Sequence, residues 1–112
     1  MLNQLVNQVI DWAEARNIIK GSTPIKQHDK LLEEVMELRD AIISNSMNPH
    51  VDWECEIEDA IGDCTVCLIN MAKMFGMDFE GCLGAAYDEI KNRKGQMIDG
   101  VFVKESSIKN FK

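Results

Sequence analysis

Two acidic clusters, each at helical spacing inside an apolar segment, constrain this chain more than any other feature. The first lies in LLEEVMEL and the second in ECEIEDAIGDCTVCLINMA. Residues three or four apart share one face of an α-helix. Glu34 and Glu37 are therefore expected to point the same way, with Glu33 one turn before Glu37, and the acids of the second cluster are expected to project from one strip. The acids are Glu33, Glu34 and Glu37 in the first cluster, and Glu56, Asp59 and Asp63 in the second. Because like charges this close weaken a helix, the pattern favours a compensating cation, and two such helices facing each other would form an oxygen-lined site suited to Mg²⁺.

Asp63 separates this pattern from an ordinary solvated helix face, which is the simpler explanation for a run of glutamates. The residues that follow Asp63, CTVCLINMAKMF, are apolar on most sides and predict a buried helix. A carboxylate that enters such a helix is costly unless it is paired, protonated or bound to a metal. No lysine or arginine lies between Glu54 and Asn70 to pair with it locally. This absence favours the metal interpretation.

Length and charge exclude several classes of protein. A chain of 112 residues is the size of one domain, so we expect a single domain over 1–112. The net charge of −7 argues against binding a nucleic-acid polymer, which requires clustered Lys and Arg, but it does not exclude a nucleotide substrate whose charge a cation offsets. The first residues have neither a basic region nor a long apolar core, so we expect no signal peptide, and no apolar run approaches the roughly 18 residues that a membrane span requires. We therefore expect a cytoplasmic protein with no membrane contact.

Apolar periodicity and helix-end signals predict an all-α fold. The expected helices cover about 2–17, 25–45, 52–75 and 79–94, and residues 96–112 form an irregular arm in which VFV could make a short strand. Thr23 and Pro24 suit the start of the second helix, and Gly76 suits the end of the third. The expected packing positions are Leu5, Val9, Trp12 and Ala13 in the first helix and Leu31, Val35, Leu38 and Ile42 in the second.

The first acidic motif resembles that of the MazG-like, all-α nucleotide pyrophosphohydrolases. Those proteins carry ExxE on one helix and ExxD on the next. Here ExxE is Glu34-Val35-Met36-Glu37, and the flanking sequence from Lys30 to Leu38 is similar to the family pattern KLxEExxEL. The resemblance covers about Trp12 to Glu105, and the tail from Asp99 to Glu105 looks like that of short phage or prophage members. It implies a four-helix MazG-like bundle completed by oligomerisation, as a homodimer or homotetramer.

The second motif departs from the family pattern. Read literally, ExxD is Glu56-Ile57-Glu58-Asp59, but alignment on the following helix makes Asp63 the terminal acid and places Ala60 where the family has glutamate. The resemblance implies Mg²⁺, with Mn²⁺ as a substitute, held by Asp63 and by acids of both clusters. Glu56 or Asp59 is expected to replace the glutamate missing at Ala60. The general base is expected to be Glu34 or Glu37. The metal ligands therefore come from Glu33, Glu34, Glu37, Glu56, Asp59 and Asp63.

Further residues are expected to bind the substrate. Lys91, Arg93 and Lys94 are, by chemistry alone, cations that a helix C-terminus favours, but the segment from Glu89 to Gly95 also resembles the family's KxNR element, which implies contacts to a triphosphate. Trp53 begins a helix and could stack on a base, whereas Trp12 is expected in the core. Asn70 lies two turns beyond Asp63 on the same face. The predicted substrate-binding residues are Lys30, Trp53, Asn70, Lys91, Asn92 and Arg93.

The resemblance implies Mg²⁺-dependent hydrolysis of a nucleoside triphosphate to its monophosphate and pyrophosphate, in nucleotide-pool house-cleaning. Such an ion would neutralise the triphosphate and activate a water for in-line attack. The alternative is a non-catalytic acidic helical interaction or regulatory protein, or a degenerate family member that binds nucleotides without cleaving them. Asp63 discriminates between these classes, because neutralising it should abolish turnover in an enzyme and leave an adaptor's partner binding nearly intact.

Overall fold

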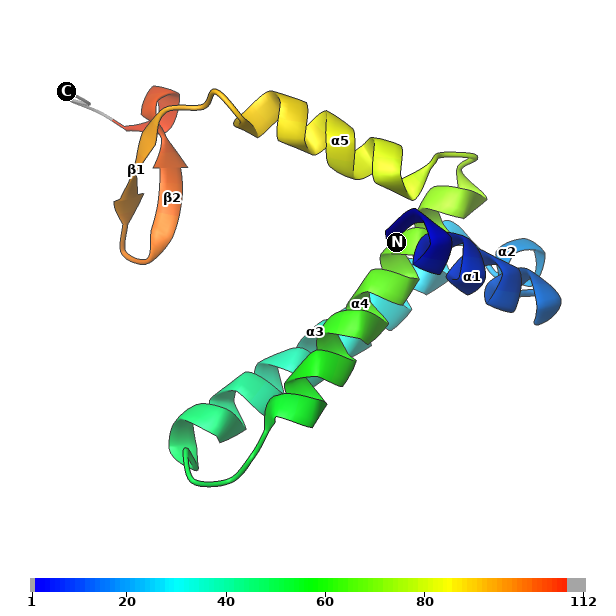
Figure 1. Ribbon diagram of the computed structural model, residues 1–112, viewed down its shortest axis with the longest axis horizontal. Helices are drawn as coiled ribbons and strands as arrows, with labels where there is room; N and C mark the ends of the chain where they lie inside the picture. The colour runs from blue at the N-terminus through cyan, green and yellow to red at the C-terminus, as the bar shows by residue number, and fades with distance from the viewer. Residues whose placement is uncertain (1, 109–112) are drawn as a thin grey trace. The chain divides into compact units, whose positions relative to one another are not determined.

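The computed structural model describes residues 2–108, and it is mostly helical (Figure 1). Its elements in chain order are α1 (Leu2–Ala15), α2 (Ile18–Gly21), α3 (Pro24–Met47), α4 (Glu54–Met74), α5 (Phe79–Ile90), β1 (Gly95–Ile98), β2 (Val101–Lys104) and the 3₁₀ helix η1 (Glu105–Ser107). The predicted all-α class is confirmed in this broad sense, with a small two-stranded sheet added. The chain divides into two compact units, one ending at Glu80 and one beginning at Gly81. The single domain predicted over 1–112 stays a prediction, and residues 1 and 109–112 lie outside the described part.

Local signals set the ends of the helices in the first unit. Asn17 has a left-handed φ of 60°, which cannot continue a right-handed helix, so the helix predicted over 2–17 ends at Ala15 and resumes briefly as α2. The Thr23 hydroxyl accepts a hydrogen bond from the backbone N–H of Lys26 at 3.3 Å, and Pro24 opens α3. Gly76, with φ of 70°, follows the end of α4. The predicted cap at Thr23 and stop at Gly76 are thus confirmed.

Helices α3 and α4 pack against each other as an antiparallel pair, and α1 and α2 both contact α4 (Figure 1). The predicted packing stripe of α3 is partly wrong. Val35 and Ile42 are 43% and 49% exposed, whereas Glu34 and Ala41 are buried. Each exposed residue follows a buried one and is therefore rotated about 100° away from the interface. The buried strip of α3 consequently places a carboxylate, Glu34, at a core position.

The predicted stripe of α1 shifts in the same way. Val6 and Ala13 are buried, whereas Leu5 is 60% and Trp12 46% exposed. Val6 and Ala13 lie seven residues apart and so share one face. Trp12 stands beside that face instead of within it. The indole predicted to fill the core is therefore available at the surface, where the Arg16 guanidinium lies 4.6 Å from its ring centre.

A second apolar stripe runs along the outside of the helix pair. Ile61 and Leu68 of α4 and Phe75, the residue directly after α4, follow each other every seven residues, and all three are exposed. On α3, Leu32, Met36 and Ile43 are also exposed, with spacings of four and seven residues. Such spacing is typical of residues that pack against another helix.

The second unit contains α5 and a β-hairpin. Strand β1 pairs antiparallel with β2, with Ile98 opposite Val101 and Gly95 opposite Lys104. Asp99 and Gly100 both have positive φ, 51° and 82°, as the two central residues of a type I′ hairpin turn require. The helix predicted over 79–94 ends at Ile90, and most of the arm predicted to be irregular is this hairpin. An Asp-Gly pair between apolar runs was the sequence signal for it.

No single helix among residues 2–108 is both long and apolar enough to cross a membrane. Only α4 and α5 taken together reach the length and composition that a span needs.

Candidate functional site

Three carboxylates converge where α3 faces α4. Glu34, Glu37 and Asp63 each place one carboxylate oxygen within 4.8 Å of the other two. Glu34 and Glu37 are one turn apart on α3, and Asp63 approaches from α4, so helical spacing and antiparallel packing together build the cluster. We call these three residues the acidic triad. Oxygen atoms of this kind are the ligands that Mg²⁺ prefers in proteins.

Glu34 is the buried member of the triad, with only 7% of its surface exposed. Its Oε1 lies 3.3 Å from Nζ of Lys30, one turn earlier on α3. Its Oε2 is buried and has no hydrogen-bond partner in the part of the chain that the structure describes. A buried polar atom without a partner carries its full cost of desolvation. Glu34 therefore has an unpaired, buried carboxylate oxygen even though Lys30 is close by.

Lys30 and Glu33 lie at the edge of this arrangement. The hydrogen bond to Glu34, followed by the charge of Glu33, raises the pKa of Lys30. Oε2 of Glu33 is 3.8 Å from Nζ of Lys30, but the side chain is largely exposed and does not join the triad. The structure thus separates the adjacent acids of the EExxE motif, with Glu34 inside and Glu33 outside.

Crowding of the carboxylates raises two pKa values. The Glu34 carboxylate, which can accept a hydrogen bond from Glu37 only when Glu37 is protonated, and repulsion from the charge of Glu34 raise the pKa of Glu37. Burial, followed by the charges of Asp59 and Glu34, raises the pKa of Asp63. Both shifts disfavour the ionised forms. A divalent cation at the triad would act in the opposite direction, by stabilising the same carboxylates as anions.

The remaining acids of the second cluster line a cavity next to the triad. This cavity has a volume of about 280 Å³ and is lined by residues that include Glu37, Trp53, Glu56, Asp59 and Asp63. The indole N–H of Trp53 is buried without a hydrogen-bond partner among the described residues. Glu56 and Asp59 therefore share a cavity with two members of the triad, and both remain candidates for the ligand that Ala60 cannot supply.

A second cavity, of about 440 Å³, begins at the triad and extends along the helix pair toward Asn70. Its lining includes Trp12, Lys30, Glu34, Asp63 and Asn70. The predicted substrate residues Lys30 and Asn70 therefore lie in one cavity with two of the triad acids. Trp12, which was predicted to pack in the core, also lines it.

Asn70 lies at one end of this cavity, in a short row of hydrogen-bonded polar side chains. It is only 3% exposed. Its Nδ2 donates to Oε1 of Gln27 at 3.5 Å, and Nε2 of Gln27 donates to the Ser22 hydroxyl at 3.5 Å. The Asn70 Oδ1 is buried with no partner among the described residues. Sequence reasoning missed Gln27, although its position seven residues before Glu34 places both on one face of α3.

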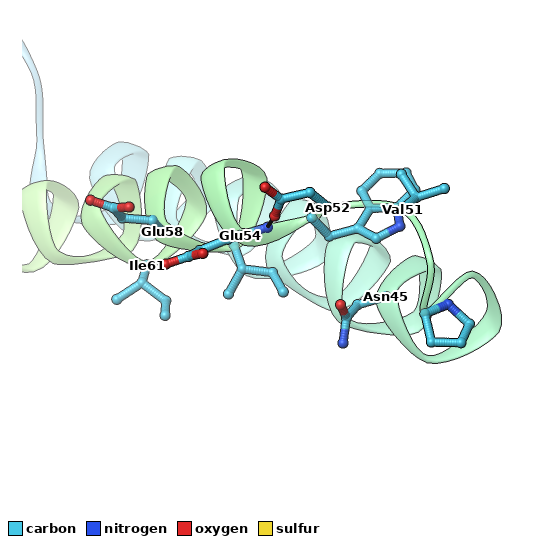
Figure 2. Close-up of a pocket in the computed structure, with 9 residues that line it drawn as sticks. Asn45, Val51, Asp52, Glu54, Glu58 and Ile61 are labelled. Atoms are coloured by element: carbon cyan, nitrogen blue, oxygen red, sulfur yellow. Dashed lines mark hydrogen bonds between the residues drawn. The ribbon is translucent and has the colours of Figure 1, made fainter.

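A larger cavity, of about 690 Å³, lies at the connection between α3 and α4 and contains no triad residue. Figure 2 shows Asn45, Asp52, Glu58 and Ile61 around it. The Asp52 carboxylate accepts a hydrogen bond from the Glu54 backbone N–H at 2.9 Å, which holds the start of α4. Size therefore does not mark the site here, because the convergent acids lie elsewhere.

The cations predicted to bind a triphosphate lie in the second unit. Lys91 pairs with Asp88 at 3.2 Å, and Arg93 lies 3.9 Å from Glu89. Asn92 and Arg93 also line a cavity of about 520 Å³ together with Lys94 and Lys104. These residues form a basic surface within their own unit, and their contact with a triphosphate stays a prediction.

The raised pKa of Glu37 predicts how stability depends on pH. In the folded chain the Glu37 carboxyl keeps its proton at pH values above 4.5, the ordinary pKa of the group. In the unfolded chain the carboxyl loses its proton near pH 4.5. Protonation of Glu37 therefore favours folding at low pH, and this contribution to stability is lost as pH rises through the folded-state pKa. Without divalent metal, we expect Glu37→Gln to melt above wild type at pH 7 and at the same temperature near pH 4. Thermal denaturation followed by circular dichroism measures both.

Glu58→Gln, an exposed glutamate of α4 outside the triad, is the matched control. The difference in melting temperature between Glu58→Gln and wild type should be the same at pH 4 and at pH 7. A Glu37→Gln variant with the same difference at both pH values would contradict the crowding of the triad.

Comparison with known proteins gives one curated relative. It is described as "Uncharacterized 18.2 kDa protein in rep-hol intergenic region" of Haemophilus phage HP1 (strain HP1c1), and it is 42% identical over 77 residues. The match covers 69% of this chain and 43% of the relative, so the chain spans less than half of that protein's length. No family model matches the chain. No solved structure matches it either. The chain is therefore similar to a phage protein whose printed description assigns no activity.

Proposed function

We propose that this protein is a Mg²⁺-dependent nucleoside triphosphate pyrophosphohydrolase, which cleaves ribo- or deoxyribonucleoside triphosphates to the monophosphate and pyrophosphate. The observation that carries the proposal is the acidic triad, three carboxylates within 4.8 Å with a buried, unpartnered Glu34 oxygen among them. The resemblance of the acidic motifs to the MazG-like enzymes supports the same activity. Turnover of this kind suits a role in nucleotide-pool house-cleaning.

The triad fits a hard divalent cation, because every donor is a carboxylate oxygen. Glu34, Glu37 and Asp63 would hold Mg²⁺, and Glu56 or Asp59 would complete the set from the adjoining cavity. When bound, Mg²⁺ neutralises phosphate charge and lowers the pKa of water. Mn²⁺ would substitute, since it accepts the same ligands.

Glu37 is the favoured general base. One oxygen of Glu34 is already paired with Lys30, whereas Glu37 is exposed, so one Glu37 oxygen can bind the metal while the other accepts a proton. In this role Glu37 accepts a proton from the water that attacks the α-phosphorus. The bond to the β-phosphate oxygen breaks, and pyrophosphate leaves with that oxygen. Lys30 offsets negative charge beside the triad.

The proposal includes self-association into a MazG-like four-helix bundle. The antiparallel pair α3–α4 exposes an apolar stripe at Ile61, Leu68 and Phe75. A second copy presents the same stripe, so a two-fold axis would pair α3–α4 with itself and bury both. We propose a homodimer as the basic assembly, with a homotetramer as a dimer of dimers.

The testing experiment is pyrophosphate release from a panel of ribo- and deoxyribonucleoside triphosphates, with Mg²⁺ and with EDTA. We expect equal amounts of monophosphate and pyrophosphate, formed only when the metal is present. Release of inorganic phosphate instead would indicate cleavage at the γ-phosphate and contradict the stated reaction. A folded protein that releases neither product would instead indicate an acidic interaction protein or a nucleotide-binding member without catalysis.

A further inference from the structure

The 440 Å³ cavity has two chemically different ends. At one end are the triad carboxylates Glu34 and Asp63, and at the other is the buried amide of Asn70. Asp63 and Asn70 are seven residues apart on α4, which corresponds to about 10 Å at 1.5 Å per residue. The two ends therefore suit a ligand with a phosphate at one end and a different polar group several bonds away.

The amide end presents an unused acceptor. Asn70 is 3% exposed, and its Oδ1 has no partner among the described residues. Its hydrogen bond to Gln27 is 3.5 Å long, at the outer limit of such bonds, so the amide can turn toward the cavity with little loss. A ligand N–H that reached Oδ1 would remove the cost of the orphaned acceptor. A ligand without an N–H at this place would leave that cost in place.

One wall of the cavity suits a flat ring. Trp12 lines the cavity and is 46% exposed. The Arg16 guanidinium donates from Nη1 to the backbone carbonyl of Trp12 at 3.1 Å and lies over one face of the indole, 4.6 Å from its centre. The other face of the indole is a stacking surface that every nucleobase can use. Stacking alone does not discriminate between bases, so Asn70 is the group in this cavity that can recognise a particular base.

We propose that Asn70 is a specificity-determining residue whose Oδ1 accepts a hydrogen bond from an amino N–H on the base edge remote from the sugar. The proposal rests on the proposed function, because it takes the triad as the end that holds the phosphates. It assigns the amide end of the cavity to the base, with Trp12 beside it.

Binding of paired analogues tests this inference independently of turnover. The probes are the α,β-methylene triphosphates of cytidine and of 2-pyrimidinone riboside, which differ in the 4-amino group, each titrated calorimetrically with Mg²⁺. We expect the analogue without the amino group to bind roughly tenfold to a hundredfold more weakly to wild type, because it leaves a buried acceptor unpaired. The equivalent purine pair, adenosine and purine riboside, covers the larger bases.

Variants at Asn70 separate reading of the base from a merely structural role. Asn70→Leu should bind both members of a pair alike, whereas Asn70→Asp, which keeps an acceptor oxygen, should restore the preference for the amino-bearing analogue. Asn45→Leu, on α3 outside this cavity, should retain the wild-type preference. If Asn70→Leu does not fold, Asn70→Ala takes its place in the same comparison.

The outcomes distinguish this inference from the proposed function. Equal binding of both analogues to wild type in both pairs, or no binding of either, overturns the role of Asn70. Persistence of the preference in Asn70→Leu overturns it as well, even if pyrophosphate is released. Binding that depends on the amino group, without any pyrophosphate release, would support the role of Asn70 and contradict the hydrolase.

Discussion

Asp63→Asn is expected to lower kcat/KM for nucleoside triphosphate hydrolysis by on the order of 10³-fold, since a catalytic metal supplies several kcal/mol and each 1.36 kcal/mol is a factor of ten. The amide keeps the size of the side chain and removes the anionic ligand that α4 contributes to the triad. Steady-state pyrophosphate release across a Mg²⁺ titration measures the loss. Higher Mg²⁺ should restore part of the rate.

The same variant should fold normally. Burial, Asp59 and Glu34 already disfavour the charge on Asp63 by raising its pKa, so replacing the carboxylate relieves repulsion in the metal-free protein. Circular dichroism should show unchanged helix content. Asp29→Asn, the same replacement at an exposed position of α3, is the control and should keep full activity. Near-wild-type turnover by a folded Asp63→Asn protein would contradict the metal role of the triad.

Leu68→Glu is expected to convert the assembled protein to a monomer. Leu68 is the middle residue of the exposed α4 stripe between Ile61 and Phe75. A carboxylate placed in an apolar interface loses its hydration, and a cost of about 4 kcal/mol raises the dissociation constant by on the order of 10³-fold. Sedimentation equilibrium over a range of concentrations measures the change in mass.

Lys73→Glu is the matched control for this prediction, because it places the same glutamate at an exposed position of α4 outside the stripe. Its assembly should match that of wild type. If wild type is monomeric at high concentration, or if Leu68→Glu assembles as wild type does, the outer stripe is not an interface between copies of this chain.

Local sequence signals predicted most of the helices. Thr23, Pro24 and Gly76 mark helix ends by their own chemistry, which depends on near neighbours. The end of α1 was missed because Asn17 adopts a left-handed conformation, which asparagine tolerates but does not require. The end of α5 at Ile90 was missed because the residues after it have no strong breaker before Gly95. The hairpin that follows was underestimated, although Asp99-Gly100 between apolar runs is a strong turn signal.

The triad was predicted as far as helical periodicity allows. Spacing alone placed Glu34 and Glu37 on one strip of α3 and Asp63 on one strip of α4. It could not decide between Glu33 and Glu34, because adjacent residues differ by about 100° and either strip could have faced α4. The packing decided it by burying Glu34 with Ala41 and exposing Val35. The predicted apolar stripe of α3, which includes Val35 and Ile42, would have turned those residues toward α4 in place of Glu34 and Ala41.

Local patterns in the chain encode the helical class, the two acidic strips and the turn at Asp99-Gly100, because each depends on interactions within about one or two helical turns or one hairpin. Long-range packing is needed to explain which acid is buried, why Trp12 lines a cavity, and how Gln27 meets Asn70 across 43 residues of chain. These features depend on the rotation and register of α3 against α4. Many weak contacts summed over the whole interface fix that rotation and register, and no local pattern encodes them.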